Sequence, residues 1–283
     1  MILVHYFRLI RPENVLLTFT SVWLAAFISP KFEITYSILW AALSASMILA
    51  GANIINDIYD LEIDKLNRPE RILASGRITV RTAWLLFYLT YFIGIIFAWL
   101  AGPSFFLIAV CMAILMVWYS AFLKRTVLLG NFLVSFAAGI TFIYGAMAIH
   151  DWQAGIIPAV FAFCYHLGRE IIKDIQDMPG DLKNNVITFP GKHGIKSSIR
   201  MVNLIFIVLI ILTLLPYIFS VYEAAYFWLV IFGVDIVLIA VMLILHFRQD
   251  PKTLAKLSFV LKIDMFVGLA SVWIGSHNVV FFN

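Results

Sequence analysis

Two copies of one acidic pattern contain the residues most able to do chemistry. Both copies read Asp-Ile-x-Asp-x-x-x-Asp. Their carboxylates are Asp57, Asp60 and Asp64 in the first motif, and Asp174, Asp177 and Asp181 in the second. Oxygen-only ligand sets suit hard cations, and Mg²⁺ is usually held by one or two carboxylates together with substrate phosphates. Because neither motif contains His or Cys, zinc and iron are disfavoured and Mg²⁺ is predicted.

The spacing of the two motifs predicts helical stripes of carboxylates. Residues i, i+3 and i+7 lie on one face of a helix, so the three aspartates of the first motif should line one stripe, with Asn56 beside it. The first two aspartates of the second motif should do the same. Pro179 and Gly180 should end or kink that helix. We therefore expect Asp181 to lie on a broken helix or a loop.

Basic residues lie close to both motifs in the sequence. Arg68 and Arg71 follow the first motif, Arg169 and Lys173 precede the second, and Lys124 follows another apolar segment. Carboxylates, Mg²⁺ and basic side chains together can form a diphosphate site. Any single one of these cations could instead be a membrane-surface anchor. The repeated spacing of the aspartates favours a binding site over ordinary solvated loop charges.

The elements that must position these residues are membrane helices. The 283 residues are 63% hydrophobic and only 13% charged, whereas soluble domains are about 25% charged. A spanning helix needs about 20 apolar residues, and lipid admits only helices or closed barrels. Nine apolar segments without strand alternation qualify: 14–30, 35–56, 80–101, 103–120, 127–149, 152–172, 198–219, 223–247 and 258–280. We expect an all-α, polytopic bundle forming a single transmembrane domain over residues 1–283, with no nucleic-acid partner.

Charge placement predicts the orientation of this bundle in the cell membrane. The connecting segments alternate between two sides, and of the 20 Lys and Arg residues only Lys31 falls on the side opposite the N-terminus. The positive-inside rule then places the N-terminus and both acidic motifs at the cytoplasmic face. A transporter would instead concentrate its charges near the bilayer midplane. Asp235 and Asp264 do lie within apolar segments, and they should face the bundle interior.

At these motifs the sequence resembles the UbiA superfamily of intramembrane prenyltransferases. That family has an Asn-Asp-x-x-Asp-x-x-x-Asp motif after its second helix and a second aspartate-rich motif after its sixth. The resemblance implies that Mg²⁺ bridges both motifs to an isoprenyl diphosphate within membrane lipid. It implies metal ligation by Asn56 and the six motif aspartates, and a catalytic role for Asp60, Asp64, Asp177 and Asp181. It also implies a diphosphate site made of Asn56, Arg68, Arg71, Lys124, Arg169 and Lys173.

The residues flanking the motifs resemble one branch of that superfamily. Asn67-Arg68-Pro69 and Arg169-Glu170-Ile-Ile-Lys173-Asp174 are similar to the digeranylgeranylglyceryl phosphate synthases of ether-lipid synthesis. This likeness implies transfer of an isoprenyl group, geranylgeranyl in this branch, to the hydroxyl of geranylgeranylglyceryl phosphate. Aromatic-acceptor enzymes share parts of the same pattern. Prenylation of 4-hydroxybenzoate, homogentisate or a quinone precursor is therefore the alternative.

Overall fold

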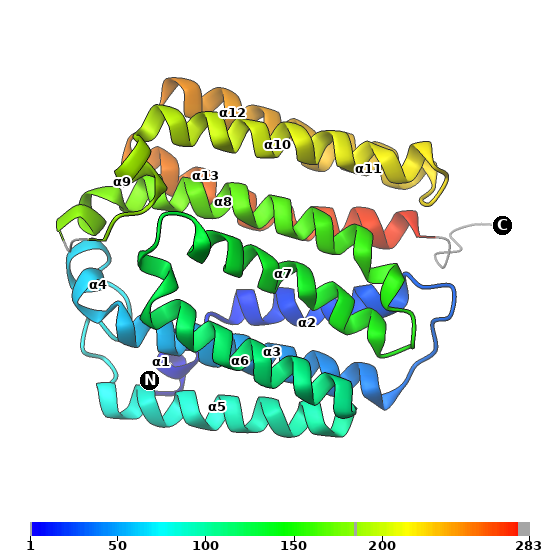
Figure 1. Ribbon diagram of the computed structural model, residues 1–283, viewed down its shortest axis with the longest axis horizontal. Helices are drawn as coiled ribbons and strands as arrows, with labels where there is room; N and C mark the ends of the chain where they lie inside the picture. Colours follow the sequence, from blue (N-terminus) through cyan, green and yellow to red (C-terminus); the bar gives the residue numbers. More distant parts are fainter. Residues whose placement is uncertain (1, 184–185, 277–283) are drawn as a thin grey trace.

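The chain folds into a bundle of long helices in the computed structural model, which describes residues 2–183 and 186–276 (Figure 1). The α-helices are α1 (Ile2–Ile10), α2 (Pro12–Phe27), α3 (Tyr36–Tyr59), α4 (Leu61–Asn67), α5 (Val80–Ala101), α6 (Pro103–Ala121), α7 (Leu129–Met147), α8 (Ile156–Lys183), α9 (Phe189–His193), α10 (Ile195–Ile218), α11 (Ala224–Leu229), α12 (Ile236–Phe247) and α13 (Pro251–Gly275). Short 3₁₀ turns occupy Leu123–Arg125 and Trp152–Gly155, and a π-helical turn (Val230–Asp235) joins α11 to α12. In the described residues no strand is present, so the predicted all-α class is confirmed.

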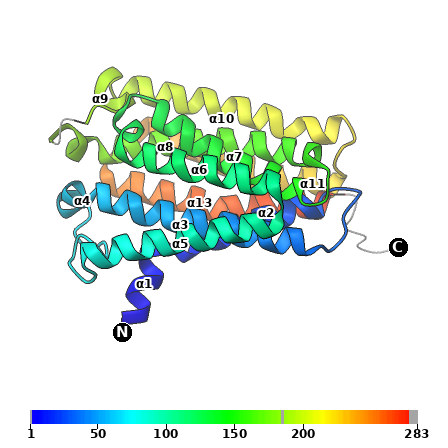
Figure 2. The same ribbon diagram turned by 60° about the horizontal axis from the view of Figure 1, so that its bottom comes forward.

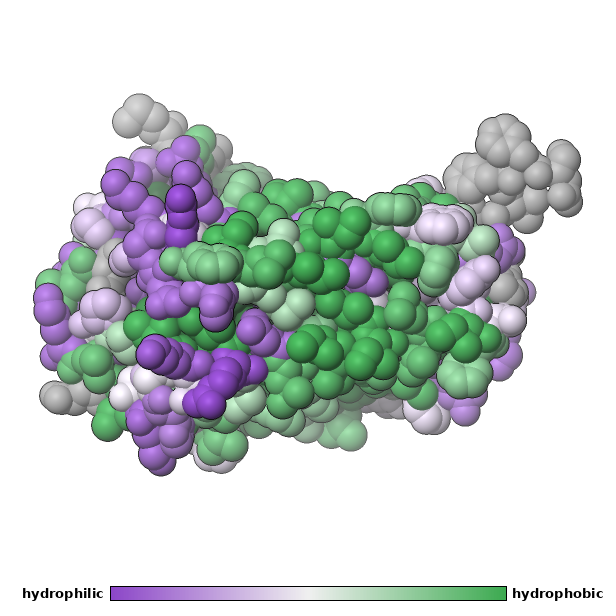
Figure 3. Space-filling model, turned by 90° about the horizontal axis from the view of Figure 1, so that it is seen from above, coloured by the Kyte–Doolittle hydropathy of each residue, from purple (hydrophilic) through white to green (hydrophobic). Residues whose placement is uncertain are grey.

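The long helices run side by side, and their polar ends gather at the two ends of the bundle. Helices α4 and α9 lie together at one end, and the α2–α3 loop and α11 lie at the other (Figure 1). Figure 3 shows a wide apolar band between these ends, with hydrophilic residues concentrated beyond it. Short α1 projects away from the side of the bundle (Figure 2). The protein is a multi-pass membrane protein.

The structure contains fewer spanning helices than the nine expected. In the described ranges, eight helices or helix pairs are long and apolar enough to cross a membrane. The predicted first span is α2, whose 16 residues extend about 24 Å, less than the ~30 Å of bilayer hydrocarbon. The segment expected at 258–280 begins earlier, at Pro251, because Asp250 caps it by accepting a bond from the Thr253 N–H at 3.0 Å. Its predicted end, 277–280, lies outside the described residues.

Small residues let the helices approach closely. A Cβ added to Gly145 of α7 would lie 2.3 Å from the carbonyl oxygen of Val22 in α2. A Cβ added to Gly168 of α8 would lie 2.2 Å from the ring of Phe206 in α10. Membrane helices lack a hydrophobic driving force for association, so such close packing is what holds them together. Both contacts fix helices that line the cavity described below.

The two acidic residues predicted to face the bundle interior are buried there. Asp235 is the last residue of the π-helical turn, and its carboxylate lies 3.1 Å from the Thr213 hydroxyl of α10. Asp264 of α13 accepts a hydrogen bond from the Tyr165 hydroxyl of α8 at 2.7 Å. Each acid is 4% exposed. Both therefore tie neighbouring helices together inside the membrane.

Candidate active site

A cavity of about 660 Å³ opens between the helices and contains nearly every residue that the motifs indicated. Much of its polar lining comes from the α3–α4 junction and the C-terminal half of α8, and its apolar lining comes from the bundle interior. The predicted residues that line it are Asn56, Asp60, Asp64, Arg68, Arg71, Lys124, Arg169, Lys173, Asp174, Asp177 and Asp181. Asp57 does not line this cavity. The structure thus gathers both motifs around one space.

Asp60 marks the junction between α3 and α4 and faces a lysine from another helix. The helical hydrogen bonds continue across the junction, since the Asp60 N–H bonds the Asn56 carbonyl at 2.9 Å and the Asp64 N–H bonds the Asp60 carbonyl at 2.7 Å. The 3₁₀ turn after α6 carries Lys124 to the Asp60 carboxylate, where the two form an ion pair. The Asn56 side-chain amide also donates to Asp60, at 2.9 Å. Asp60 is therefore held on two sides.

Asp57 and Asp64 share one arginine, Arg71, and of the two aspartates only Asp64 lines the cavity. Arg71 donates to Asp64 at 2.5 Å and lies 3.4 Å from Asp57. Arg11, which precedes α2, pairs with Asp57 from the other side. Burial raises the pKa of Asp64, and the neighbouring Arg71 opposes this by favouring the charged form. The first motif therefore keeps three buried carboxylates close together by giving each a cation.

The second motif lies on one continuous helix, contrary to the expectation for Asp181. Helix α8 runs through Pro179 to Lys183, so Asp181 is helical and the predicted break is wrong. Proline removes one N–H bond and crowds the carbonyl four residues earlier, here that of Ile175. Pro179 lies only four residues before the end of α8, and there the loss of one backbone hydrogen bond does not stop the helix. Asp181 therefore lines the cavity from the same helix as Asp174 and Asp177.

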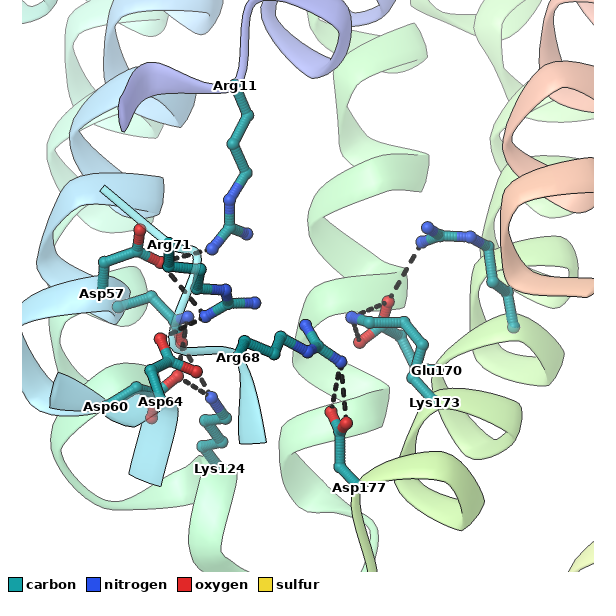
Figure 4. Close-up of polar contacts among 12 residues, drawn as sticks. Arg11, Asp57, Asp60, Asp64, Arg68, Arg71, Lys124, Glu170, Lys173 and Asp177 are labelled. Atoms are coloured by element: carbon teal, nitrogen blue, oxygen red, sulfur yellow. Dashed lines mark hydrogen bonds and ion pairs between the residues drawn. The ribbon is translucent and has the colours of Figure 1, made fainter. Parts of the chain in front are cut away.

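The partners of the second motif are an amide and a distant arginine. The Asn131 side chain of α7 donates to Asp174 at 2.7 Å. Arg68, in the loop after the first motif, donates one Nη2 group to both oxygens of Asp177 at 2.7 Å. Figure 4 shows this arginine reaching from the side of the first motif toward α8. Arg68 therefore joins the two motifs directly.

A separate charged group lies on α8 before the second motif. Lys173 donates to both oxygens of Glu170, at 2.8 and 2.7 Å, and Arg169 lies 3.4 Å from the same carboxylate. Figure 4 places Glu170 and Lys173 apart from Asp60 and Lys124, with Arg68 between them. The predicted basic residues thus fall into two groups rather than one.

The donor set of the cavity fits Mg²⁺ only in combination with phosphate oxygens. In the described ranges, no three His, Cys, Asp or Glu side chains are grouped so that they could hold a metal ion by themselves. Mg²⁺ keeps few protein ligands and is usually completed by substrate phosphates and water. Carboxylates on both sides of the cavity supply the one or two protein oxygens such an ion needs. The residues therefore fit a Mg²⁺–diphosphate complex.

Sequence reasoning missed three residues that hold the motif side chains. Arg11, Asn131 and Glu170 contact motif aspartates or predicted cations. Asn131 had a usable signal, because an amide in an otherwise apolar span needs a polar partner. Arg11 and Glu170 look like ordinary charges near a membrane surface. The role of Arg11 depends on packing between the start of α2 and α3, whereas Glu170 pairs with its near neighbours on α8, Arg169 and Lys173.

Comparisons with known proteins agree with the fold and motifs. The family model described as the UbiA prenyltransferase family matches residues 14–269. Digeranylgeranylglyceryl phosphate synthase of Methanosphaera stadtmanae is 31% identical, covering 96% of this chain and 98% of that protein. A solved structure from work on digeranylgeranylglyceryl phosphate synthase in membranes is 30% identical, with a TM-score of 0.77 over 98% of this chain and 99% of that one.

A more distant structure shares the fold. A UbiA homologue from Archaeoglobus fulgidus, solved with GPP and Mg²⁺, is 19% identical, with a TM-score of 0.65 over 95% of this chain and 99% of that one. The resemblance inferred from the two acidic motifs is confirmed. The chain belongs to the UbiA prenyltransferase family.

Proposed function

We propose that this protein transfers a geranylgeranyl group from its diphosphate to the hydroxyl of geranylgeranylglyceryl phosphate, with Mg²⁺, at the cytoplasmic face of the membrane. The observation that carries the proposal is the ion pair between Arg68 and Asp177. It brings a residue that follows the first motif onto the second motif, so both acidic motifs face one cavity. The similarity to digeranylgeranylglyceryl phosphate synthases over most of the chain supports this choice of substrates.

The ion pairs of the cavity suggest how a diphosphate would be received. Lys124 forms an ion pair with Asp60, and Arg68 forms one with Asp177. A phosphate oxygen of the donor could therefore replace the carboxylate as the partner of each cation. The released carboxylates, with Asp64 and Asp181, would hold Mg²⁺. Bound Mg²⁺ would neutralise charge on the diphosphate as it leaves. Arg68 and Lys124 would stabilise the same charge through charge-assisted hydrogen bonds.

The rest of the cavity explains why transfer would win over hydrolysis. The bond between C1 of the donor and its diphosphate oxygen breaks, and the electron pair leaves with the diphosphate. The acceptor hydroxyl oxygen bonds to C1, and its proton passes to the departing diphosphate. Apolar residues such as Ile48, Met112 and Phe161 line the cavity, and they would exclude water from the reacting carbon of a bound donor. Product formation therefore requires the acceptor hydroxyl to be held beside C1.

The polar end of the bundle is assigned to the cytoplasm on the basis of charge. Both motifs, α4 and α9 lie at this end, together with nearly all Lys and Arg residues of the connecting segments. Such a bias favours the cytoplasmic side. A cysteine introduced at exposed Lys192 should react with a membrane-impermeant maleimide in inverted vesicles, where the cytoplasmic face is accessible. The same cysteine should not react in intact cells. Labelling in intact cells would reverse the orientation.

A transfer assay in detergent tests the proposed reaction. Geranylgeranyl diphosphate and Mg²⁺ are offered with geranylgeranylglyceryl phosphate, and separately with 4-hydroxybenzoate. An ether product with the glyceryl phosphate is expected, and excess EDTA should abolish it. Product only from the aromatic acid would reject the ether-lipid assignment. Full activity in EDTA would reject the Mg²⁺ site.

A further inference from the structure

The basic residues that line the cavity differ in the acids they contact. One group pairs with motif aspartates: Arg11, Arg68, Arg71 and Lys124. A second group pairs with glutamates outside both motifs: Arg169, Lys173 and Lys262. The second group is on α8 and α13, whereas Lys124 and the first motif are on α3, α4 and the turn after α6, and Figure 4 shows Lys173 and Glu170 apart from Lys124 and Asp60. The cavity therefore has two centres of positive charge.

Arg169 is fixed in place yet keeps donors for a ligand. Its Nε group donates to the Ser258 carbonyl of α13 at 3.2 Å, and its Nη1 group lies 3.4 Å from Glu170. A guanidinium has five N–H donors. Among the described residues these are its two hydrogen-bonding contacts, and its side chain, 17% exposed, lines the cavity. The remaining donors are available to an anion.

Lys262 adds a second cation beside Arg169. Its ammonium pairs with Glu13 of α2 at 2.7 Å, and its side chain is 17% exposed whereas that of Glu13 is 52% exposed. The partner is thus a solvated carboxylate, which a phosphate can displace at small cost because exposed ion pairs contribute little. The positive charge of Arg169 acts on Lys262 as a like charge, so the two side chains repel one another. An anion between them would relieve that repulsion.

The location suits the second phosphorylated substrate rather than the first. Arg169 precedes Asp177 by eight residues on α8, which is about 12 Å along the helix axis. In a glyceryl phosphate the phosphate and the reacting hydroxyl are separated by a few single bonds of about 1.5 Å each. The acceptor's phosphate must therefore lie in this cavity, near the donor's diphosphate. Two anions on the same cations would repel each other strongly in so buried a place.

We propose that Arg169 and Lys262 form the binding site for the phosphate of the acceptor lipid, separate from the donor diphosphate site at the acidic motifs. The assignment rests on the proposed function, because it presupposes a phosphorylated acceptor. It removes Arg169 from the predicted diphosphate site. It also gives a function to Lys262, which neither motif includes.

Steady-state kinetics with two acceptors test the assignment. The variants are Arg169→Gln and Lys262→Gln, and Lys256→Gln is the matched control, an exposed lysine six residues earlier on α13 that does not line the cavity. The acceptors are geranylgeranylglyceryl phosphate and geranylgeranylglycerol, which lacks the phosphate. Each of the first two variants should raise the KM for the phosphorylated acceptor about tenfold to a hundredfold. The KM for the donor and the rate with geranylgeranylglycerol should stay within about twofold, and Arg169→Lys should restore part of the loss.

The outcomes separate this assignment from the proposed function. If the unaltered protein makes ether product but the two variants raise the donor KM instead, or lose activity equally with both acceptors, the phosphate site is wrong and the function stands. If the unaltered protein makes no product from geranylgeranylglyceryl phosphate, both fail. Retained donor binding in each variant, measured by calorimetry, shows that the variant is folded.

Discussion

The two acidic motifs share one spacing but have different surroundings. In the first motif all three carboxylates are buried, and each pairs with an arginine or lysine drawn from α1–α2, the α4–α5 loop or the turn after α6. In the second, Asp174 contacts only an amide among described residues, and the Asp177 side chain is 28% exposed. Among the described residues, each carboxylate of the first motif therefore pairs with a cation, whereas in the second motif only Asp177 does, with Arg68. Equal spacing therefore does not mean equal roles.

The largest expected effect comes from removing one cavity-lining carboxylate of each motif. Asp60→Ala and Asp177→Ala should each lower kcat at least about a thousandfold, because each removes a group that would hold Mg²⁺ against the leaving diphosphate. The rate of product formation at saturating substrate concentrations measures kcat, and thermal melting in detergent is the control for folding. Near-normal turnover of the folded Asp177→Ala protein would show that the second motif is dispensable.

The second-largest effect is expected from removing the ion pair between Arg68 and Asp177, which joins the two motifs. Arg68→Gln removes both the contact to Asp177 and a diphosphate donor, so kcat/KM for the donor should fall about tenfold to a hundredfold. Arg68→Lys should recover only part, since lysine lacks the planar fork. Exposed Arg77→Gln is the matched control in the same loop. An equal loss in Arg77→Gln would point to general loop charge instead.

Asp57 should behave unlike its two motif neighbours. It does not line the cavity but pairs with both Arg11 and Arg71. Asp57→Asn should therefore mainly destabilise the protein, by about 3 kcal/mol, because two cations lose a buried partner. A lower melting temperature in detergent with a small change in donor KM is expected. A loss of turnover as large as that of Asp60→Ala, with unchanged melting, would place Asp57 at the metal.

The smallest effect concerns pH. Burial raises the pKa of Asp64, so the folded protein binds this proton more readily than the unfolded chain does. That contribution to stability is present at low pH and is lost as the pH rises through the raised pKa, when Asp64 becomes charged beside Arg71. Arg71→Gln removes the opposing cation, so the acidic limb of the pH–rate profile should move to higher pH. If the acidic limb stays at the same pH in Arg71→Gln, a group other than Asp64 determines its position.

Much of this arrangement followed from the sequence, because local periodicity determines it. The apolar segments predicted the helical bundle, and the aspartate spacing predicted one stripe of Asp57, Asp60 and Asp64, of which Asp60 and Asp64 line the cavity and Asp57 does not. The contacts of Arg68 with Asp177 and of Asn131 with Asp174 join residues 109 and 43 positions apart. Such pairings depend on how α3, α7 and α8 pack, which no local pattern encodes.

The π-helical turn Val230–Asp235 makes this part of the bundle tolerant of a change in chain length. A π turn accommodates one extra residue within an α-helix. Deleting one residue of the turn before Asp235 would let α11 and α12 form one regular helix, while the residues on either side keep the faces they now present. The contact of Asp235 with Thr213 should therefore survive such a deletion. The same deletion in the middle of α12 should be far more harmful, because every side chain after it would rotate by about 100°.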